Sequence, residues 1–167
     1  MKLARLTLGA LLGLMLNAAS LAAVAGEPQA LSRGEWQKIR KAHAGRPTIV
    51  HLWGLTCAPC RVEMPEWGKL VRDNPGVNLI TIHAERAPPD PRTVRAMLED
   101  AGLLSADNWM FDDGFLERLR YEIAPKWRGE LPMTLLIDRD GATSTISGPA
   151  DLAAVRAWLQ LQSRSAE

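Results

Sequence analysis

The chain has 167 residues, of which 47% are hydrophobic and 23% are charged, with 20 Lys and Arg against 19 Asp and Glu. These proportions are ordinary for a globular protein and exclude collagen-like, low-complexity and wholly disordered chains. A formal net charge of +1 without a long basic run offers no surface for a phosphate backbone, so we expect no nucleic-acid partner. Two cysteines cannot form a multi-disulfide scaffold, and the length predicts one hydrophobic core.

Residues 1–25 have the organisation of a secretory signal peptide. Two basic residues precede an apolar run over residues 6–16, and a motif of small residues suited to signal peptidase ends at Ala25. We therefore predict cleavage after Ala25 and one domain over residues 26–167, outside the cytoplasm. The alternative is an uncleaved N-terminal membrane anchor, because residues 6–25 are mostly apolar and a bilayer requires roughly 20 such residues.

After this segment the hydrophobic pattern alternates between helical and strand spacing, which is typical of an α/β protein. A helix capped by Ser32 and ending near Gly45 comes first. A buried strand over residues 48–53 follows, and then a helix over residues 57–74 that Pro65 should interrupt and kink. The remaining predicted elements are a strand over 77–82, a helix over 91–101 capped by Asp90, a short strand over 109–111, a helical face of Phe115, Leu116, Leu119 and Ile123, a hairpin of strands 133–137 and 142–147, and a helix over 151–162.

The chemistry of the chain is concentrated in the tetrapeptide Cys57-Ala58-Pro59-Cys60, between a predicted buried strand and a predicted helix. Unpaired amide groups and the helix dipole stabilise negative charge at a helix N-terminus, so the pKa of Cys57 should lie below that of a free thiol. We therefore predict that the Cys57 thiolate attacks a substrate disulfide. Cys60, three residues later and more shielded, would then resolve the mixed disulfide.

Other roles for the cysteine pair stay open from the residues alone. Zinc usually takes four ligands, but the chain has no second cysteine pair, and His43, His51 and His83 are scattered along it. An inert disulfide is another alternative. A further one is Cu(I) handling, because the two thiolates together with Met64, Met133 or a histidine would offer the soft ligands that this ion prefers.

Two segments resemble a known family. The run from Pro47 to Pro65, PTIVHLWGLTCAPCRVEMP, resembles the active-site segment of the thioredoxin superfamily, and specifically of its exported TlpA/ResA-like thiol-disulfide oxidoreductases. The run from Leu131 to Gly141, LPMTLLIDRDG, resembles the cis-proline segment and hairpin of that family. The resemblance implies a thioredoxin fold with a central mixed β-sheet, helices on both faces, and an insertion between core strands at residues 84–124.

The resemblance also implies roles for single residues. Pro132 corresponds to the cis-proline beside the cysteine pair, and cis peptides are essentially confined to X-Pro bonds. The backbone of Leu131 would then pair with an extended substrate peptide. Glu63 matches the acidic position of the family, and its place three residues after Cys60 puts both on one helical face, where a carboxylate can exchange protons with a thiol.

The chain also departs from the family pattern. His51 stands six residues before Cys57, where the family carries a buried aspartate or asparagine, and an imidazole there would exchange protons with the resolving thiol. A core histidine without a catalytic role is the alternative. Thr56 replaces the usual tryptophan before the first cysteine, and Met133 replaces a common threonine, so partner specificity does not follow from the resemblance.

We accordingly expect a monomeric periplasmic thiol-disulfide oxidoreductase that uses no cofactor or metal and acts on protein thiols and disulfides. Pro59 resembles the reducing members of the family, which favours reduction of a specific partner. The family implies a membrane thiol-transfer protein as electron donor, and apocytochrome c or a copper-site protein as client. The alternatives are an oxidant that donates disulfides, and a Cu(I)-binding, chaperone-type or interaction protein without turnover, as the changes at Thr56 and Met133 would allow.

Overall fold

The structure, a computed structural model, describes residues 27–85, 90–112, 114 and 116–164. The predicted signal segment and Phe115 of the expected helical face lie outside these residues. None of the helices in the described ranges is long and apolar enough to span a bilayer.

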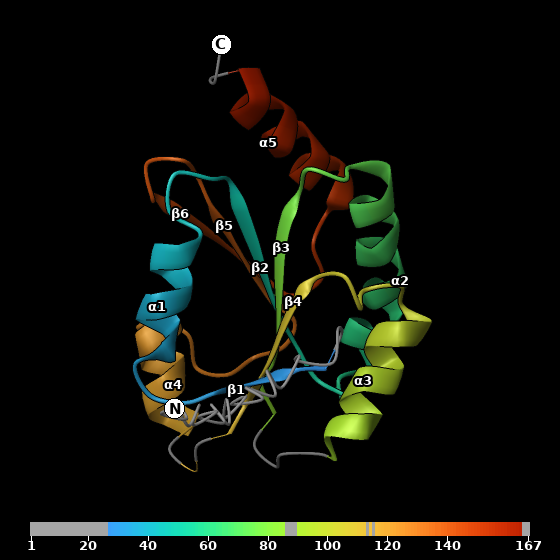
Figure 1. Cartoon of the computed structure of the whole chain (residues 1–167), viewed down its shortest axis with the longest axis vertical. Helices are drawn as coiled ribbons and strands as arrows, with labels where there is room; N and C mark the ends of the chain where they lie inside the picture. The colour runs from blue at the N-terminus through green and yellow to red at the C-terminus, as the bar shows by residue number, and fades with distance from the viewer. Residues whose placement is uncertain (1–26, 86–89, 113, 115, 165–167) are drawn as a thin grey trace, which may run out of the picture.

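The described residues form one mixed sheet of six strands in the order β1-β4-β3-β2-β5-β6 (Figure 1). Strands β1, β4, β3 and β2 are parallel to one another, β5 is antiparallel to β2, and β6 is antiparallel to β5. The strand bounds are β1 (Gln29–Leu31), β2 (Thr48–Trp53), β3 (Asn78–His83), β4 (Asp107–Phe111), β5 (Met133–Ile137) and β6 (Thr143–Ser147).

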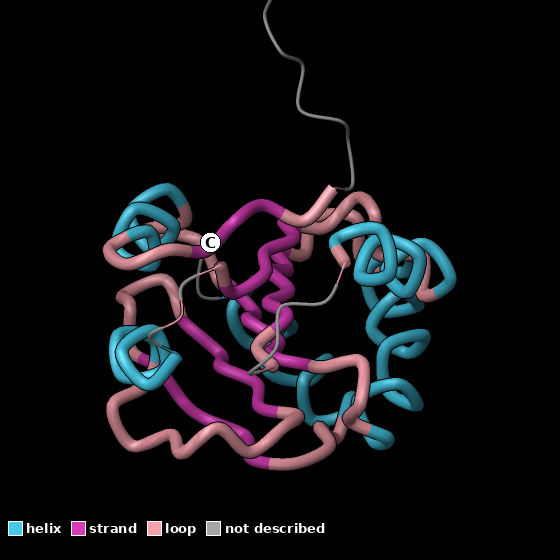
Figure 2. The backbone as a smooth tube through the Cα atoms, turned by 90° about the horizontal axis from the view of Figure 1, so that it is seen from below, coloured by secondary structure: helices cyan, strands magenta, loops and turns pink. Residues whose placement is uncertain are grey.

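Helices cover both faces of this sheet, as Figure 2 shows from below. The helix bounds are α1 (Glu35–Ala42), α2 (Ala58–Asp73), α3 (Pro91–Asp100), α4 (Leu116–Ile123) and α5 (Leu152–Arg164). One core cluster joins α1 and α4 to one face, and a second joins α2, α3 and α5 to the other. The expected fold class, a mixed sheet with helices on both faces, is therefore confirmed.

The central strand β2 is buried along its whole length, as its apolar sequence predicts. Its side chains alternate between the two faces: Val50 and Leu52 belong to the α1 and α4 cluster, whereas Ile49 and Trp53 belong to the α2 cluster. His51 shares the second face, because its ring contacts Trp67 of α2. The strand thus aligns a histidine with the helix that follows the cysteine motif.

The segment between β3 and β5 contains α3, β4 and α4, which is where the insertion was expected. Strand β4 enters the sheet between β1 and β3 and pairs in parallel with both. Asp90 caps α3 as predicted, since its side chain accepts a hydrogen bond from the Arg92 N–H at 3.0 Å. The insertion therefore widens the sheet by a strand instead of forming a separate lobe.

Two local expectations were wrong, and one strand was missed. The N-cap of α1 is Gly34 and not Ser32: glycine takes the left-handed conformation there with φ of 81°, and Ser32 contributes only its carbonyl, which accepts from the Glu35 N–H. Helix α2 runs through Pro65 without interruption. Strand β1 was not predicted, because three residues carry no periodic signal and their pairing with β4 is distant in sequence.

Candidate active site

Cys57 lies directly before α2 and acts as its N-cap. Its backbone is extended, its Sγ accepts a hydrogen bond from the Cys60 N–H at 3.3 Å, and Pro59 occupies the first turn, where the missing N–H costs no helical hydrogen bond. The two cysteines form a disulfide. The predicted placement of the first cysteine at a helix N-terminus is therefore confirmed.

The two sulfur-bearing residues differ in exposure. Cys57 is partly exposed and is flanked by the exposed residues Thr56 and Ala58, whereas Cys60 is fully buried. Cys60 packs in the α2 cluster with Met64 and other apolar side chains. The first cysteine is therefore the more accessible of the two, which is the asymmetry that the sequence predicted.

The Leu131–Pro132 peptide bond is cis, which confirms the expected conformation. Pro132 is buried and its carbonyl accepts from the Gly148 N–H at 2.9 Å. The next residue, Met133, pairs with Leu52 near the end of β2, so the proline lies at the edge of the sheet from which the cysteine loop leaves. Leu131 is half-buried; its role in peptide binding stays a prediction.

His51 is fully buried on the α2 side of the sheet. Its Nδ1 lies 3.1 Å from Thr134 Oγ1 on the neighbouring strand, and its ring centroid lies 4.9 Å from that of Trp67. Its Nε2 is buried without a hydrogen-bond partner in the described part of the chain. Burial lowers the pKa of His51 to about 3, so the imidazole is neutral at physiological pH.

Glu63 is buried on α2 with 7% of its surface exposed. Its Oε1 accepts from Trp67 Nε1–H at 3.0 Å and from the Ala150 N–H at 3.0 Å, while its Oε2 is buried without a partner among the described residues. Burial raises the pKa of the Glu63 carboxyl, although the hydrogen bonds from Ala150 and Trp67 oppose this shift. Trp67 therefore contacts both His51 and Glu63.

A second polar group, which the sequence analysis missed, adjoins the cysteine loop. Glu85 Oε1 accepts from the Thr56 N–H at 2.7 Å and from Thr56 Oγ1 at 2.5 Å, and its Oε2 lies 3.2 Å from His83 Nε2. The ring of His83 meets Trp53 edge-on, with centroids 5.2 Å apart. The sequence offers only a weak signal for this contact. Glu85 follows β3, which is parallel to β2, and parallel strands end at the same edge of a sheet.

The structure separates the candidate copper ligands. Met64 packs in the α2 cluster together with Cys60, but Met133 packs in the cluster on the other face of the sheet. Across the described ranges, no group of three or more His, Cys, Asp or Glu side chains is arranged to hold a metal ion. The two methionines therefore do not join the cysteines in one ligand set.

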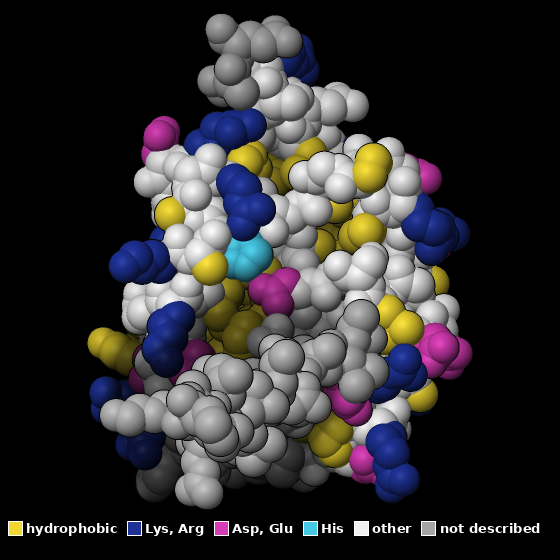
Figure 3. Space-filling model, in the orientation of Figure 1, with side chains coloured by type: hydrophobic (Ala, Val, Ile, Leu, Met, Phe, Trp, Pro, Cys, Tyr) yellow, Lys and Arg dark blue, Asp and Glu magenta, His cyan; other side chains and the backbone are white. Residues whose placement is uncertain are grey.

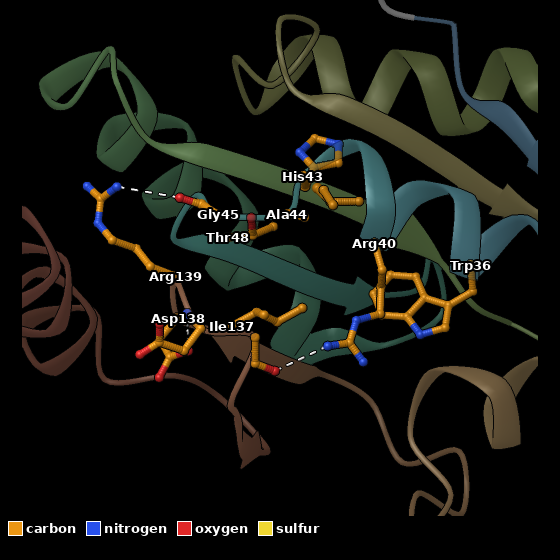
Figure 4. Close-up of a pocket in the computed structure, with 12 residues that line it drawn as sticks. Trp36, Arg40, His43, Ala44, Gly45, Thr48, Ile137, Asp138 and Arg139 are labelled. Carbon is orange, nitrogen blue, oxygen red and sulfur yellow. Dashed lines mark hydrogen bonds between the residues drawn. The ribbon is translucent and has the colours of Figure 1, made fainter. Parts of the chain in front are cut away.

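A cavity of about 120 Å³ lies at the opposite end of the sheet (Figure 4). It is lined by the start of β2 at Thr48, the end of β5 at Ile137, and polar side chains that include Arg40 and His43. Arg40 donates to the Gly141 carbonyl at 3.2 Å across this opening. Because Cys57 follows the other end of β2, this cavity is not part of the cysteine site.

The surface in Figure 3 has Lys and Arg side chains spaced along the edge that carries α1, with Asp and Glu side chains among them. Hydrophobic side chains are visible in the hollows between these charges. This mixed distribution agrees with the near-neutral composition and gives no continuous basic surface on this face.

No protein-family model matches the chain. Solved structures do resemble it. A thiol:disulfide interchange protein of the thioredoxin family from Chlorobium tepidum is 20% identical, with a TM-score of 0.56 over 74% of this chain and 83% of that chain. StoA from Bacillus subtilis is 24% identical, with a TM-score of 0.54 over 70% of this chain and 84% of that chain.

A secreted Mycobacterium tuberculosis disulfide oxidoreductase, described as homologous to E. coli DsbE, is 19% identical, with a TM-score of 0.53 over 66% of this chain and 75% of that chain. These structures share a sheet and helix arrangement with the present one at low identity. Similarity of this kind establishes the fold, while activity has to be argued from the site. The chain therefore has the thioredoxin fold, as its two family-like segments implied.

Proposed function

We propose that the protein is a periplasmic thiol-disulfide oxidoreductase that reduces a specific protein partner. The observation that carries the proposal is the Cys57–Cys60 disulfide at the N-terminus of α2, with its first residue accessible and its second fully buried. The thioredoxin-fold oxidoreductases that the chain resembles support the same chemistry.

The reaction uses both cysteines in turn. In the reduced protein the Cys57 thiolate, favoured by the N-terminus of α2, attacks one sulfur of the partner disulfide and displaces the other sulfur as a thiolate. Cys60 then loses its proton and attacks Cys57 Sγ, which releases the second partner thiolate. Two electrons pass to the partner, and the protein is left with the Cys57–Cys60 disulfide.

Glu63 and His51 are our candidates for proton transfer and hydrogen bonding at the buried thiol. Glu63 lies three residues after Cys60 on the same helix, and burial raises the pKa of its carboxyl above the ordinary value, which favours a group that accepts and returns a proton. His51 lies on the same side of the sheet with an unpartnered Nε2, but its pKa of about 3 keeps it neutral, so it acts as a hydrogen-bonding neighbour and Glu63 carries the proton. Trp67 contacts both residues, so it fixes their orientation.

Leu131 and Pro132 form the proposed substrate-binding edge. Pro132 lies directly before β5, whose first residue Met133 pairs with Leu52 near the end of β2, and this position beside the cysteine loop supports pairing of the Leu131 backbone with an extended peptide from the partner. No cofactor is required, because the electrons leave from the dithiol itself.

A reductant in an oxidising compartment needs a source of electrons, and we assign this role to a membrane thiol-transfer protein. The clients are proteins with an accessible disulfide, of which apocytochrome c and copper-site proteins are the family examples. Export through residues 1–25 is tested by N-terminal sequencing of the protein recovered from the periplasm: Gly26 as the first residue supports cleavage, and Met1 supports an anchor.

The decisive experiment is the equilibrium reduction potential of the purified protein in glutathione or dithiothreitol buffers, with Cys57→Ser as the control. A value of about −270 mV supports a reductase, whereas a value of about −120 mV makes the protein a disulfide donor. Failure of the wild-type protein to cycle refutes the redox function and leaves a binding role.

A further inference from the structure

The residue directly before Cys57 is held by a carboxylate from another strand. Glu85 Oε1 receives both the backbone N–H and the hydroxyl of Thr56, at 2.7 and 2.5 Å. Thr56 itself is exposed and belongs to no helix or strand, so local structure does not account for its position. Glu85 therefore joins the end of β3 to the loop that presents the accessible sulfur.

His83 supports this carboxylate from the interior. Its side chain is 1% exposed, that of Glu85 is 15% exposed, and Nε2 and Oε2 are 3.2 Å apart. An ionised carboxylate can only accept, so His83 Nε2 carries the proton of this hydrogen bond. The edge-on contact with Trp53 holds the imidazole in place.

The hydrogen-bonded group of Thr56, Glu85 and His83 carries a net negative charge. Burial lowers the pKa of His83, although Glu85 acts in the opposite direction, so the imidazole is neutral at pH 7. Burial by itself would raise the pKa of Glu85, but the hydrogen bonds from Thr56 and the contact with His83 hold it below its ordinary value. Glu85 accepts a hydrogen bond from Thr56 N, and Thr56 N is joined to Cys57 Sγ by a short run of covalent bonds. The sulfur therefore lies within about 10 Å of this carboxylate.

We propose that Glu85 is a positioning residue for the exchange reaction at Cys57, and that its charge opposes formation of the Cys57 thiolate. This inference rests on the proposed function. The N-terminus of α2 favours the thiolate, and Glu85 acts against it. A less stabilised thiolate makes the reduced protein less stable relative to the disulfide, so the pair becomes a stronger reductant. The carboxylate thereby favours electron flow from the protein to its partner.

The test compares Glu85→Gln with the wild-type full chain. Glutamine keeps an acceptor oxygen for Thr56 and removes the charge. The pKa of Cys57, measured from the pH dependence of alkylation of the reduced protein by iodoacetamide, should fall by about half a unit. The equilibrium in which the protein dithiol and oxidised glutathione form the protein disulfide and two reduced glutathiones should shift toward the reduced protein, by roughly threefold.

Glu122→Gln is the matched control. Glu122 also accepts from a backbone N–H, that of Gly34 at 3.0 Å, but it belongs to α4 on the other face of the sheet. This variant loses the same charge and should leave the Cys57 pKa and the glutathione equilibrium unchanged. An equal shift in Glu122→Gln, or no shift in a folded Glu85→Gln, overturns the assignment.

Thr56→Val separates positioning from charge at an exposed residue where folding is not at risk. It removes the hydroxyl donor and retains the carboxylate, so the rate of exchange with glutathione should fall several-fold at an unchanged Cys57 pKa. An unchanged rate refutes the positioning role. If the wild-type protein does not exchange with glutathione at all, the proposed function itself fails; if it does and Glu85→Gln titrates like it, only the present inference fails.

Discussion

The two ends of the sheet differ in how far the polar groups within them are hydrogen-bonded. At the end where β2 starts, His43 pairs both ring nitrogens: Nδ1 lies 2.9 Å from Asn78 Oδ1, and Nε2 lies 3.0 Å from Asp107 Oδ2. Asn78 in turn donates to Thr48 Oγ1 at 2.6 Å. These hydrogen bonds form a continuous chain that links the first residues of three parallel strands, β2, β3 and β4.

Hydrogen bonding is less complete on the side of the sheet that carries the cysteines. His51 Nε2, Trp53 Nε1 and Glu63 Oε2 are buried without hydrogen-bond partners in the described part of the chain. A buried polar atom without a partner costs about 1 to 3 kcal/mol, so these three atoms lower the stability of the α2 side of the sheet. Polar groups at the start of β2 link neighbouring strands through hydrogen bonds, whereas the three atoms on the α2 side keep hydrogen-bonding capacity that the described residues do not use.

The strongest test of this contrast is replacement of each cysteine. Cys57→Ser is expected to abolish exchange with glutathione disulfide, because Cys60 is fully buried. Cys60→Ser should retain the first step and accumulate a mixed disulfide at Cys57, detected by intact-protein mass spectrometry. Accumulation of the adduct in Cys57→Ser would show that the order of attack is reversed.

Glu63→Gln tests the proton-transfer role of the α2 side. Oxidation of the dithiol at neutral pH should slow by about 100-fold, the lower end of what a general acid or base contributes. Burial raises the pKa of this carboxyl above its value in the unfolded chain. At a pH above the folded pKa, the ionised carboxylate therefore destabilises the fold. The variant should therefore unfold at a higher temperature than the wild type at pH 7. A slower reaction without this gain in stability would indicate distortion of α2.

Local signals account for the parts of the fold that the sequence predicted. Asp90 before Pro91 predicted the start of α3, and Asp140-Gly141 predicted the hairpin in which Gly141 takes φ of 86°. The cysteine motif predicted both the N-terminus of α2 and the unequal exposure of its sulfurs. Each of these features depends on residues that are neighbours in the chain.

The missed features depend on distant contacts. Strand β1 exists because Gln29–Leu31 pairs with β4, and Glu85 meets Thr56 because two parallel strands end at the same edge. Gly34 replaces Ser32 as the cap of α1, where its N–H also donates to Glu122 of α4. No spacing within one segment reports such contacts, so sequence patterns could not predict them.

His51→Asn tests the buried imidazole through acid stability. The pKa of His51 is about 3 in the folded protein and about 6.5 when unfolded, so below pH 6.5 only the unfolded chain gains a proton here. This loss of stability should reach about 3 kcal/mol by pH 4.5 in the wild type and be absent in the variant, measured by urea unfolding. Thr134→Val, which leaves the imidazole buried, should keep the wild-type slope. An unchanged slope in His51→Asn would mean that His51 does not titrate in this way.

His43→Ala at the start of β2 should produce the smallest effect and define the other side of the comparison. Loss of the imidazole leaves Asn78 and Asp107 without their shared partner, which should cost about 1 to 2 kcal/mol of unfolding free energy. The reduction potential and the Cys57 pKa should stay at their wild-type values, because this network lies at the opposite end of β2 from the disulfide. A shift in potential comparable to that of a variant on the α2 side would show that the two ends are coupled through the sheet, and the division between a structural end and a reactive end would no longer hold.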